Sequence, residues 1–386
     1  MEFSRCEARI SLDAIENNLH QMARMIRQDT QIMVVIKADG YGHGAIEIAK
    51  DTESLKYIWG FAVATTEEAA SLRAGGITKP ILILGRVFPE DFSFCISHDI
   101  RIPIMDTEGA KAFSDVAVSM KKDACIHIKL DTGMRRIGFL AAEESVKEIV
   151  DICRLPGLKA EGLFTHFFAS DSKDKTSMHK QLQTFDHIKE LLQNEGISFP
   201  IYHVSNSAAI IDAPEANKDV VRAGITTYGL WPSDEVDKTR IHLEPAMEVV
   251  ARVAFVKEIM PKDTVGYGAT YTAQEVKKIA TVGFGYADGY PRKLSGRGWV
   301  LIHGQKAPIV GRVCMDQMMV DVTNLTEEVC VGDEVVLVGT SGDETITMEM
   351  LGDLSGRFNY EFACEISPRV PRVFLKKDKV ISTRKF

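Results

Sequence analysis

The chain has 386 residues, of which 45% are hydrophobic and 26% are charged, as is usual for a globular protein with an ample core. Its length favours two domains over one. The net charge of -8 argues against nucleic acid as a partner, because phosphates require a basic surface. The sequence has neither a window near the ~20 apolar residues of a membrane span nor a signal peptide core, so we expect a cytoplasmic protein without membrane association.

The seven cysteines are odd in number and scattered, and none forms a Cys-x-x-Cys pair. This pattern is typical of reduced, buried thiols and favours neither a disulfide framework nor a zinc site, so we expect no metal. We expect the basic C-terminal tail to be a solvated terminus. Its cationic residues are Lys376, Lys377, Lys379, Arg384 and Lys385.

Short apolar runs alternate with helix-like stretches in the first part of the chain. Eight runs are typical of strands: 32–36, 59–64, 81–84, 100–105, 125–130, 158–165, 201–204 and 220–225. Segment 66–75 has the acidic first turn and terminal glycine of a helix. Eight strand–helix units predict an N-terminal (β/α)8 barrel of the TIM type. The alternative, an open doubly wound sheet, would normally have a Gly-x-Gly-x-x-Gly turn after its first strand, and the sequence has none there.

The second part of the chain is predicted to be mostly β, with one helix at 347–357. Its valine-rich runs are 249–258, 279–284, 299–303, 308–313, 318–322 and 334–338. Pro232 and Pro245 enclose a polar stretch between the two parts. We place the boundary there, which gives an α/β barrel domain of residues 1–240 and a C-terminal β domain of residues 241–386.

The most informative segment is IKADGYGHG, residues 36–44, which begins at the end of the first predicted strand. The strand fixes the base of Lys37, and three glycines in five residues let the following loop pass close to a bulky group. A lysine held in this way can form a Schiff base with an aldehyde. The alternative is a lysine that simply extends from a strand into a flexible turn.

Two polar segments follow later strands of the predicted barrel. KLDTGMRRIG, residues 129–138, places a lysine, an aspartate and two arginines where they could bind a carboxylate or a phenolate. A surface loop with a local salt bridge would also explain this segment. FTHF, residues 164–167, ends the sixth strand with a histidine, and an isolated histidine at such a place is more often structural than catalytic.

The seventh and eighth strands run into HVSNSAA, residues 203–209, and RAGI, residues 222–225. Small hydroxylated residues that open a helix can bind an anion through unpaired backbone N–H groups, and a phosphate site after these two strands recurs in such barrels. Plain helix capping by Ser205 or Ser207 is the alternative.

The C-terminal part contains further candidate segments. VGYGATY, residues 265–271, places Tyr267 between two glycines that expose its phenol, although an ordinary turn between strands would have the same pattern. The other segments are GYADGYPR at 285–292, GRVCMDQ at 311–317 and NYE at 359–361.

From residue 37 to residue 372, these segments together resemble the motifs of the alanine racemases, which are pyridoxal phosphate enzymes of fold type III. Residues 37–44 match Lys-Ala-(Asn/Asp)-Ala-Tyr-Gly-His-Gly except that Gly40 replaces alanine, and Phe164 replaces the tyrosine of Tyr-Thr-His-Phe. The resemblance implies a head-to-tail homodimer that interconverts L-alanine and D-alanine by a two-base mechanism. Such an enzyme supplies D-alanine for peptidoglycan synthesis.

The resemblance also implies roles for individual residues. Lys37 and Tyr267 are the two catalytic bases. The cofactor-binding residues are Lys37, Tyr41, His166, Asn206, Ser207, Arg222, Gly224, Ile225 and Tyr360. The substrate-binding residues are Arg136, Met315 and Tyr286, and the supporting residues are Lys129, His203, Asp316 and Arg312. Lys129 matches a lysine that is N-carboxylated in many members, and Arg222 faces the pyridine nitrogen, whose proton a guanidinium cannot accept.

Three alternatives stay open on the motifs. A basic amino acid decarboxylase would need a cysteine acid at its site, for which Cys314 is the only candidate. A non-enzymatic protein that binds pyridoxal phosphate would resemble the barrel alone. A serine-preferring or broader-specificity racemase would share every motif.

Overall fold

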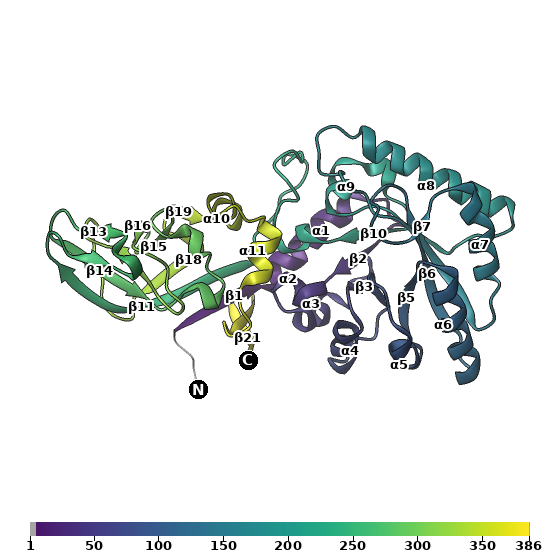
Figure 1. The fold of residues 1–386 in the computed structure, drawn as a ribbon, viewed down its shortest axis with the longest axis horizontal. Helices are drawn as coiled ribbons and strands as arrows, with labels where there is room; N and C mark the ends of the chain where they lie inside the picture. The colour runs from purple at the N-terminus through teal and green to yellow at the C-terminus, as the bar shows by residue number, and fades with distance from the viewer. Residues whose placement is uncertain (1–4, 386) are drawn as a thin grey trace. The chain divides into compact units, whose positions relative to one another are not determined.

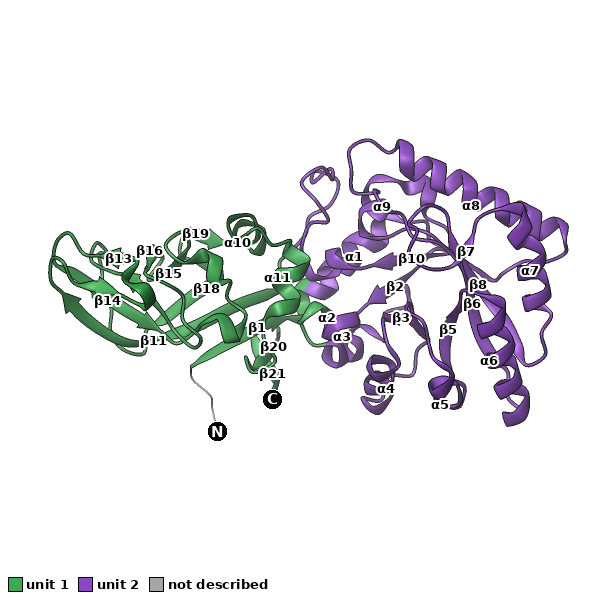
Figure 2. Cartoon of the chain, in the orientation of Figure 1, with its two compact units in different colours: residues 1–14, 41–44, 245–386 green, residues 15–40, 45–244 purple. Residues whose placement is uncertain are grey.

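The computed structural model describes residues 5–385 and divides the chain into two compact units. Unit 1 consists of residues 1–14, 41–44 and 245–386, and unit 2 consists of residues 15–40 and 45–244 (Figure 2). The division differs from a single cut at residue 240, because the first 14 residues and the loop 41–44 group with the C-terminal part.

Unit 2 contains eight parallel strands in the order β10-β2-β3-β4-β5-β6-β8-β9, and the short β7 (Phe139–Leu140) pairs with β6. Their bounds are β2 (Gln31–Val35), β3 (Ile58–Val63), β4 (Ile81–Ile83), β5 (Ile100–Ile104), β6 (Ala124–Asp131), β8 (Leu158–Phe164), β9 (Ile201–His203) and β10 (Val220–Ala223). Asp219 N donates to Tyr202 O (3.2 Å) and Arg222 N donates to Ser205 O (3.1 Å), which joins the two ends of the order. The predicted eight-stranded barrel is confirmed.

Helices α3 to α8 lie around the outside of these strands (Figure 1). The helices associated with the barrel are α1 (Leu12–Met25), α3 (Ala45–Thr52), α4 (Thr66–Ala74), α5 (Phe92–Ser97), α6 (Thr107–Met120), α7 (Glu143–Cys153), α8 (Thr176–Asn194) and α9 (Ser207–Asp212). Local sequence explains their starts: the side chain of Thr65 accepts from Glu68 N at α4, and that of Asp106 accepts from Gly109 N at α6. The loops that follow the strands gather at the carboxyl rim of the barrel, where function resides in this fold.

Unit 1 contains a ten-stranded sheet in the order β19-β18-β15-β16-β17-β14-β11-β1-β20-β21. The bounds are β1 (Cys6–Ser11), β11 (Met247–Ile259), β14 (Lys277–Val282), β15 (Trp299–Ile302), β16 (Gln305–Val310), β17 (Met318–Asp321), β18 (Glu334–Ser341), β19 (Glu344–Ile346), β20 (Arg372–Lys376) and β21 (Lys379–Arg384). β12 (Thr264–Val265) pairs with β13 (Tyr271–Thr272), and two helices follow, α10 (Met348–Ser355) and α11 (Asn359–Glu365). All six predicted strands and the predicted helix are present.

Two sequence-based expectations for unit 1 are wrong. The basic tail is not a solvated terminus, because β20 and β21 pair antiparallel and β20 also pairs with β1. Phe374 is fully buried in β20, whereas β21 is an edge strand whose cations protect it from pairing with another chain. All seven cysteines are free, as expected, but Cys330 and Cys364 are exposed rather than buried.

None of the helices between residues 5 and 385 is long and apolar enough to cross a membrane.

Arg372 explains why the loop 41–44 belongs to unit 1. Its buried guanidinium donates to the carbonyl of Gly42 (Nε, 3.0 Å) and to the carbonyls of Ile366, Ser367 and Val370. Gly42 adopts φ 79°, and a Cβ there would lie 2.5 Å from the carbonyl oxygen of Ala363. Only glycine fits this close approach.

Arg372→Leu should therefore lower the free energy of unfolding by about 3 kcal/mol or more, because it leaves several buried carbonyls without donors. Urea denaturation would measure this loss. Lys379→Ala on the exposed edge strand is the control and should change stability by less than about 0.5 kcal/mol. Equal stability of Arg372→Leu and the wild type would show that the loop is held by other contacts.

Candidate active site

Lys37 follows β2 and begins α2 (Lys37–Tyr41), a turn whose backbone is left-handed. The φ angles of Ala38, Asp39 and Gly40 are 50°, 54° and 63°, with ψ between 43° and 48°. This conformation costs an ordinary L-residue about 1–2 kcal/mol. Gly40 N donates to Ile36 O (2.8 Å), so the turn is nevertheless closed by a hydrogen bond.

Two carboxylates hold this turn in place. Glu68 of α4 accepts from Ala38 N through Oε1 (2.6 Å) and from Ala64 N, just after β3, through Oε2 (2.7 Å). Asp39 Oδ1 accepts from Ala45 N at the start of α3 (3.0 Å). A strained backbone persists only where its surroundings over-determine it, and these bonds fix the base of Lys37 to the rim of the barrel.

Lys129 of β6 is 3% exposed, and its Nζ donates to Leu130 O (2.6 Å). Burial, with the nearby charge of Arg222, lowers the pKa of Lys129 to about 7. Its Nζ lies 5.5 Å from the ring centroid of Phe164, which stacks on His203 at 4.6 Å with an interplanar angle of 6°. A phenylalanine suits this enclosed place, because a tyrosine hydroxyl would need a partner there.

Arg222 of β10 is the buried centre of the rim. It donates to the carbonyls of His203 (2.7 Å), Thr165 (2.7 Å) and Val204 (3.0 Å), and to Nδ1 of His203 (3.0 Å). Burial lowers the pKa of Arg222 to about 9, so the guanidinium is still charged at pH 7.

His166 follows β8 beside Arg222, whose Nη2 lies 3.4 Å from His166 Nδ1. Burial, and then the positive charge of Arg222, lower the pKa of His166 well below its usual value. The imidazole is therefore neutral at pH 7. Arg136, which is exposed, also lowers the pKa of His166, so its charge acts at the same place.

The loops after β9 and β10 are joined through Ser207. Its Oγ accepts from Gly224 N (2.9 Å) and from Thr226 Oγ1 (3.0 Å). Asn206, rather than either serine, caps α9, because its Oδ1 accepts from Ala209 N (3.2 Å). Ser205 Oγ is buried and has no hydrogen-bond partner among residues 5–385. The capping alternative is therefore wrong, and a buried hydroxyl stays available.

Ile225, which follows Gly224, is buried and begins the 3₁₀ helix η3 (Ile225–Tyr228). The structure thus brings together, at the rim of unit 2, the predicted residues of strands β6, β8, β9 and β10. These residues are Lys129, His166, His203, Asn206, Ser207, Arg222, Gly224 and Ile225.

Tyr267 of unit 1 is 69% exposed and lies between Gly266 (φ 75°) and Gly268 (φ 72°). A Cβ on Gly268 would lie 3.3 Å from the guanidinium of Arg312, so the two predicted residues share one loop surface. The glycines present the phenol to solvent in the described chain, as the sequence predicted.

Tyr286 and Met315 lie on loops that are hydrogen-bonded to each other. Tyr286 N donates to Cys314 O (3.0 Å), and Ala287 N donates to Met315 O (2.9 Å). Asp316 pairs with Arg369 (2.6 Å), whose Nε also bonds the fully buried Asp288 (2.6 Å). Tyr286, Met315 and Asp316 therefore lie on one exposed surface of unit 1, and the buried carboxylate of Asp288 holds this surface through Arg369.

Tyr360, another predicted site residue of unit 1, contacts two aromatic rings. Its ring stacks on Phe358 (4.5 Å between centroids) and lies 6.1 Å from the ring of Tyr41. The loop 41–44 thus brings Tyr41 to Tyr360 inside this unit.

Within residues 5–385, no group of three or more His, Cys, Asp or Glu side chains could hold a metal ion.

Sequence reasoning missed several residues of the site. Glu68 gave no signal beyond an acidic first turn. His127, Glu161 and Arg101 did give a signal, because each is a polar residue inside a segment that was predicted to be a buried strand. Such residues in a strand deserve to be treated as candidates.

Glu68→Gln should loosen the turn after Lys37, because the amide nitrogen cannot accept and one of the two N–H groups loses its partner. Amide hydrogen exchange in a peptide spanning residues 36–44 should become at least about tenfold faster. Glu67→Gln, on the exposed face of the same helix turn, should leave exchange unchanged. Unchanged exchange in Glu68→Gln would mean that the remaining contacts suffice to hold the turn.

Comparisons with known proteins agree with this arrangement. The profile of the alanine racemase N-terminal domain matches residues 10–232, and that of the alanine racemase C-terminal domain matches residues 246–374. The two matches cover both parts of the chain, whereas a non-enzymatic protein that binds pyridoxal phosphate would resemble the barrel alone.

Individual proteins are similar along the whole chain. An alanine racemase of Clostridium perfringens is 45% identical over 98% of this chain and 97% of its own length. The structure of an alanine racemase from Clostridium difficile 630 matches with a TM-score of 0.96 and 40% identity, covering 100% of this chain and 99% of that chain.

The structure of an alanine racemase from Bacillus anthracis with bound L-Ala-P matches with a TM-score of 0.93 and 35% identity, covering 100% of this chain and 98% of that chain. Both domain profiles match in order, and a relative is 45% identical over 98% of this chain, so the chain belongs to the alanine racemase family.

Proposed function

We propose that this protein interconverts L-alanine and D-alanine, with pyridoxal phosphate bound at the rim of unit 2. The observation that carries the proposal is the buried guanidinium of Arg222 beside Lys129 and the neutral His166, on the rim where Lys37 is fixed. The hydrogen-bond acceptors of Arg222 are carbonyl oxygens and imidazole nitrogens, so its charge is available to an anionic or electron-rich ligand.

The residues of the rim fit this cofactor. The buried hydroxyl of Ser205 has no partner among the described residues, and Ser207 links the two loops expected to bind phosphate. We infer that Ser207, Gly224 and Ile225 hold the phosphate, with Asn206 supporting the loop. When bound, pyridoxal phosphate supplies an electron sink for the charge that develops at Cα. Arg222 would donate toward the ring nitrogen, and a guanidinium could not take a proton from it.

Two side chains move the Cα proton in this proposal. Lys37 Nζ takes or returns it on one face, and Tyr267 Oη does so on the other. Bases on opposite faces invert a centre without requiring the substrate to turn over. The left-handed turn and Glu68 restrict where Lys37 can reach, which favours proton transfer in one geometry.

The second base is proposed to come from a partner copy in a head-to-tail homodimer. Tyr267, Met315 and Tyr286 are 69%, 53% and 42% exposed in the single chain, although each is a large hydrophobic side chain. Surfaces of this kind are typical of contacts between subunits. Arg312, next to the loop of Tyr267, would lie in the same contact.

Arg136 is proposed to bind the carboxylate of alanine, oriented by Lys129. A pKa near 7 leaves much of the Lys129 amine uncharged at neutral pH, which favours its reaction with CO₂ to a carbamate and a released proton. The carbamate would pair with the guanidinium of Arg136.

Alanine is favoured as the substrate over serine or larger amino acids. The compared proteins are named for alanine, and one was solved with L-Ala-P. Met315 and Tyr286 would leave room for a methyl group and little more, and Tyr360 with Tyr41 would narrow the entry.

Lys37→Ala should abolish racemisation in both directions, with a loss of at least about 10²–10⁴-fold, because the proton carrier of one face is removed. Borohydride reduction followed by peptide mass spectrometry should place the cofactor on the Lys37 peptide in the wild type and on no peptide of the variant. Lys111→Ala, an exposed lysine on α6, is the control and should behave as the wild type. A reducible adduct at normal stoichiometry in Lys37→Ala would refute the assignment.

Tyr267→Phe should separate the two faces. Racemisation must fall equally in both directions, because the equilibrium between enantiomers is fixed at unity. In heavy water, deuterium should still enter Cα of D-alanine through Lys37, whereas entry into L-alanine should fall by about 10²–10⁴-fold. Equal exchange from both enantiomers would show that one base serves both faces.

The same variants test the homodimer. Lys37→Ala and Tyr267→Phe should each be inactive alone, but a mixed dimer would contain one site with both bases intact. Mixing the two proteins under conditions that exchange subunits should restore activity. Failure of fully exchanged mixtures would place Tyr267 in the site of its own chain.

A further inference from the structure

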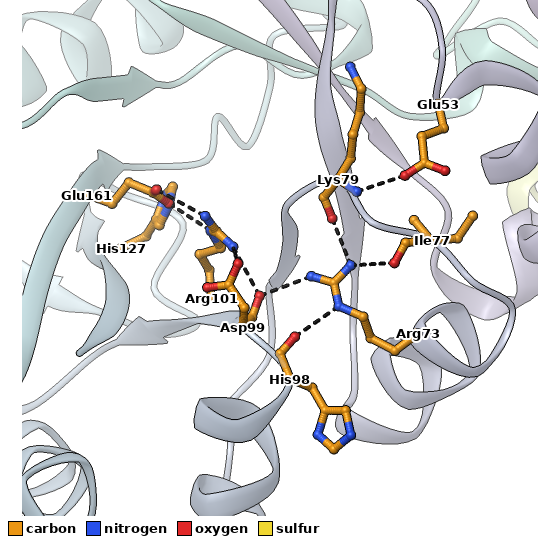
Figure 3. Close-up of polar contacts among 9 residues, drawn as sticks. All are labelled: Glu53, Arg73, Ile77, Lys79, His98, Asp99, Arg101, His127 and Glu161. Carbon is orange, nitrogen blue, oxygen red and sulfur yellow. Dashed lines mark hydrogen bonds and ion pairs between the residues drawn. The ribbon is translucent and has the colours of Figure 1, made fainter. Parts of the chain in front are cut away.

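The interior of the barrel contains a continuous chain of polar side chains from five strands. Arg222 Nη1 lies 3.0 Å from His203 Nδ1, His203 Nε2 lies 2.8 Å from His127 Nδ1, and His127 Nε2 lies 3.0 Å from Glu161 Oε2. Arg101 then donates to the same carboxylate (Nε to Oε2, 3.0 Å). Figure 3 shows the end of this chain at His127, Glu161 and Arg101. Barrels are normally filled by branched apolar side chains, so this chain is unusual.

Only one arrangement of protons satisfies these contacts. A guanidinium can only donate, so His203 Nδ1 must accept from Arg222 and the ring proton of His203 lies on Nε2. His127 Nδ1 must then accept from His203, which places the proton of His127 on Nε2, facing Glu161. Burial lowers the pKa of both histidines, so both rings are neutral at pH 7.

The positions of the two rings are fixed by their neighbours. A Cβ on Gly162 of β8 would lie 2.2 Å from His127 Nδ1, so glycine alone leaves room for this ring. Trp59 meets the ring of His127 edge-on at 5.8 Å, and Phe164 stacks on His203. Both histidines are fully buried, and their ring nitrogens are paired with each other, with Arg222 and with Glu161.

Glu161 ends this chain as an ionised carboxylate. Burial acts to raise the pKa of Glu161, but hydrogen bonds from His127 and Arg101 outweigh it and lower the pKa to about 2. Arg101 also pairs with Asp99 (2.8 Å), and Arg73 donates to the carbonyl of Asp99 (3.0 Å; Figure 3). The carboxylate is thus anchored from the outside of the barrel.

We infer that Glu161 is a positioning residue for Arg222: by accepting from His127 Nε2 it fixes the tautomers of both histidines and keeps His203 Nδ1 as the acceptor that orients the guanidinium. Reversal of the His127 tautomer would turn N–H toward N–H at His203. His203 would then have to reverse as well, and its Nδ1–H would face the N–H groups of Arg222. Arg222 and Glu161 thus oppose this reversal from opposite ends. Without Glu161, the native order leaves the buried Nε2–H of His127 without its acceptor, so the two orders become comparable in free energy. The effect of this orientation on the cofactor rests on the proposed function, whereas the tautomers do not.

Three variants separate the acceptor from the charge. Glu161→Gln keeps an oxygen that can accept from His127, and Glu161→Leu removes every acceptor. Arg101→Met/Glu161→Leu also removes the cation that Glu161→Leu leaves buried, which keeps the test available if the single variant does not fold. Asp99→Asn is the control, because it removes a carboxylate that bonds Arg101 and whose side chain is 73% exposed, without touching Glu161.

Imidazole ¹⁵N spectra of histidine-labelled holoenzyme, assigned with His127→Asn and His203→Asn, would report the tautomers directly. The wild type, Asp99→Asn and Glu161→Gln should show both rings protonated at Nε2. Glu161→Leu and the double variant should show mixed tautomers at both rings. Unchanged tautomers in whichever of these two variants folds would overturn the inference.

Binding and kinetics test the consequence for Arg222. In the variants without an acceptor, the Kd for pyridoxal phosphate should rise, and kcat should fall by about 10–100-fold with KM for alanine changed much less, as for outer residues that orient a ligand-binding group. Mixed tautomers with unaltered Kd and kcat would overturn the link to Arg222. A wild type without racemase activity would refute the proposed function and leave the tautomer result standing.

Discussion

A cation buried in the barrel rim is the constraint on which the rest of unit 2 depends. Arg222 is 4% exposed, and desolvating a guanidinium is costly unless each of its N–H groups finds an acceptor. The strand ends meet this demand at Nη1 and Nη2 with three carbonyl oxygens and two imidazoles. The same arrangement keeps carboxylates away from the guanidinium, so a bound ligand meets an uncompensated charge.

Lys37 follows β2, the strand that pairs with the strand of Arg222, and its position is fixed by different contacts. The turn after Lys37 stores strain in left-handed residues, and Glu68 and Asp39 offset that strain with hydrogen bonds to backbone N–H groups. Glu68 and Asp39 accept from backbone N–H groups, and Glu161 reaches Arg222 only through two histidines. These carboxylates therefore position the rim without forming an ion pair with Arg222.

Much of this could be predicted from the sequence, for identifiable reasons. The barrel strands were predictable because parallel strands buried on both faces are continuous apolar runs, and Lys37 stood out by its glycine-rich loop. β1 and the C-terminal hairpin were not, because β1 pairs with β11 and with β20 of the hairpin, and both partners are far away in sequence. Glu68 was not, because its role arises from contacts with the backbone of Ala38, which no spacing reveals.

Stability does not explain the polar side chains that link Arg222 to Glu161. Replacing buried ionic groups by packed apolar side chains is often neutral or stabilising, so an apolar barrel would serve folding at least as well. An apolar interior could not fix the direction of the hydrogen bonds that orient Arg222. Two neutral imidazoles between a guanidinium and a carboxylate have only one arrangement of protons in which every hydrogen bond forms. Position 162 must be glycine, because a Cβ there would collide with the ring of His127. The interior of this barrel is therefore built to orient the charge at its rim.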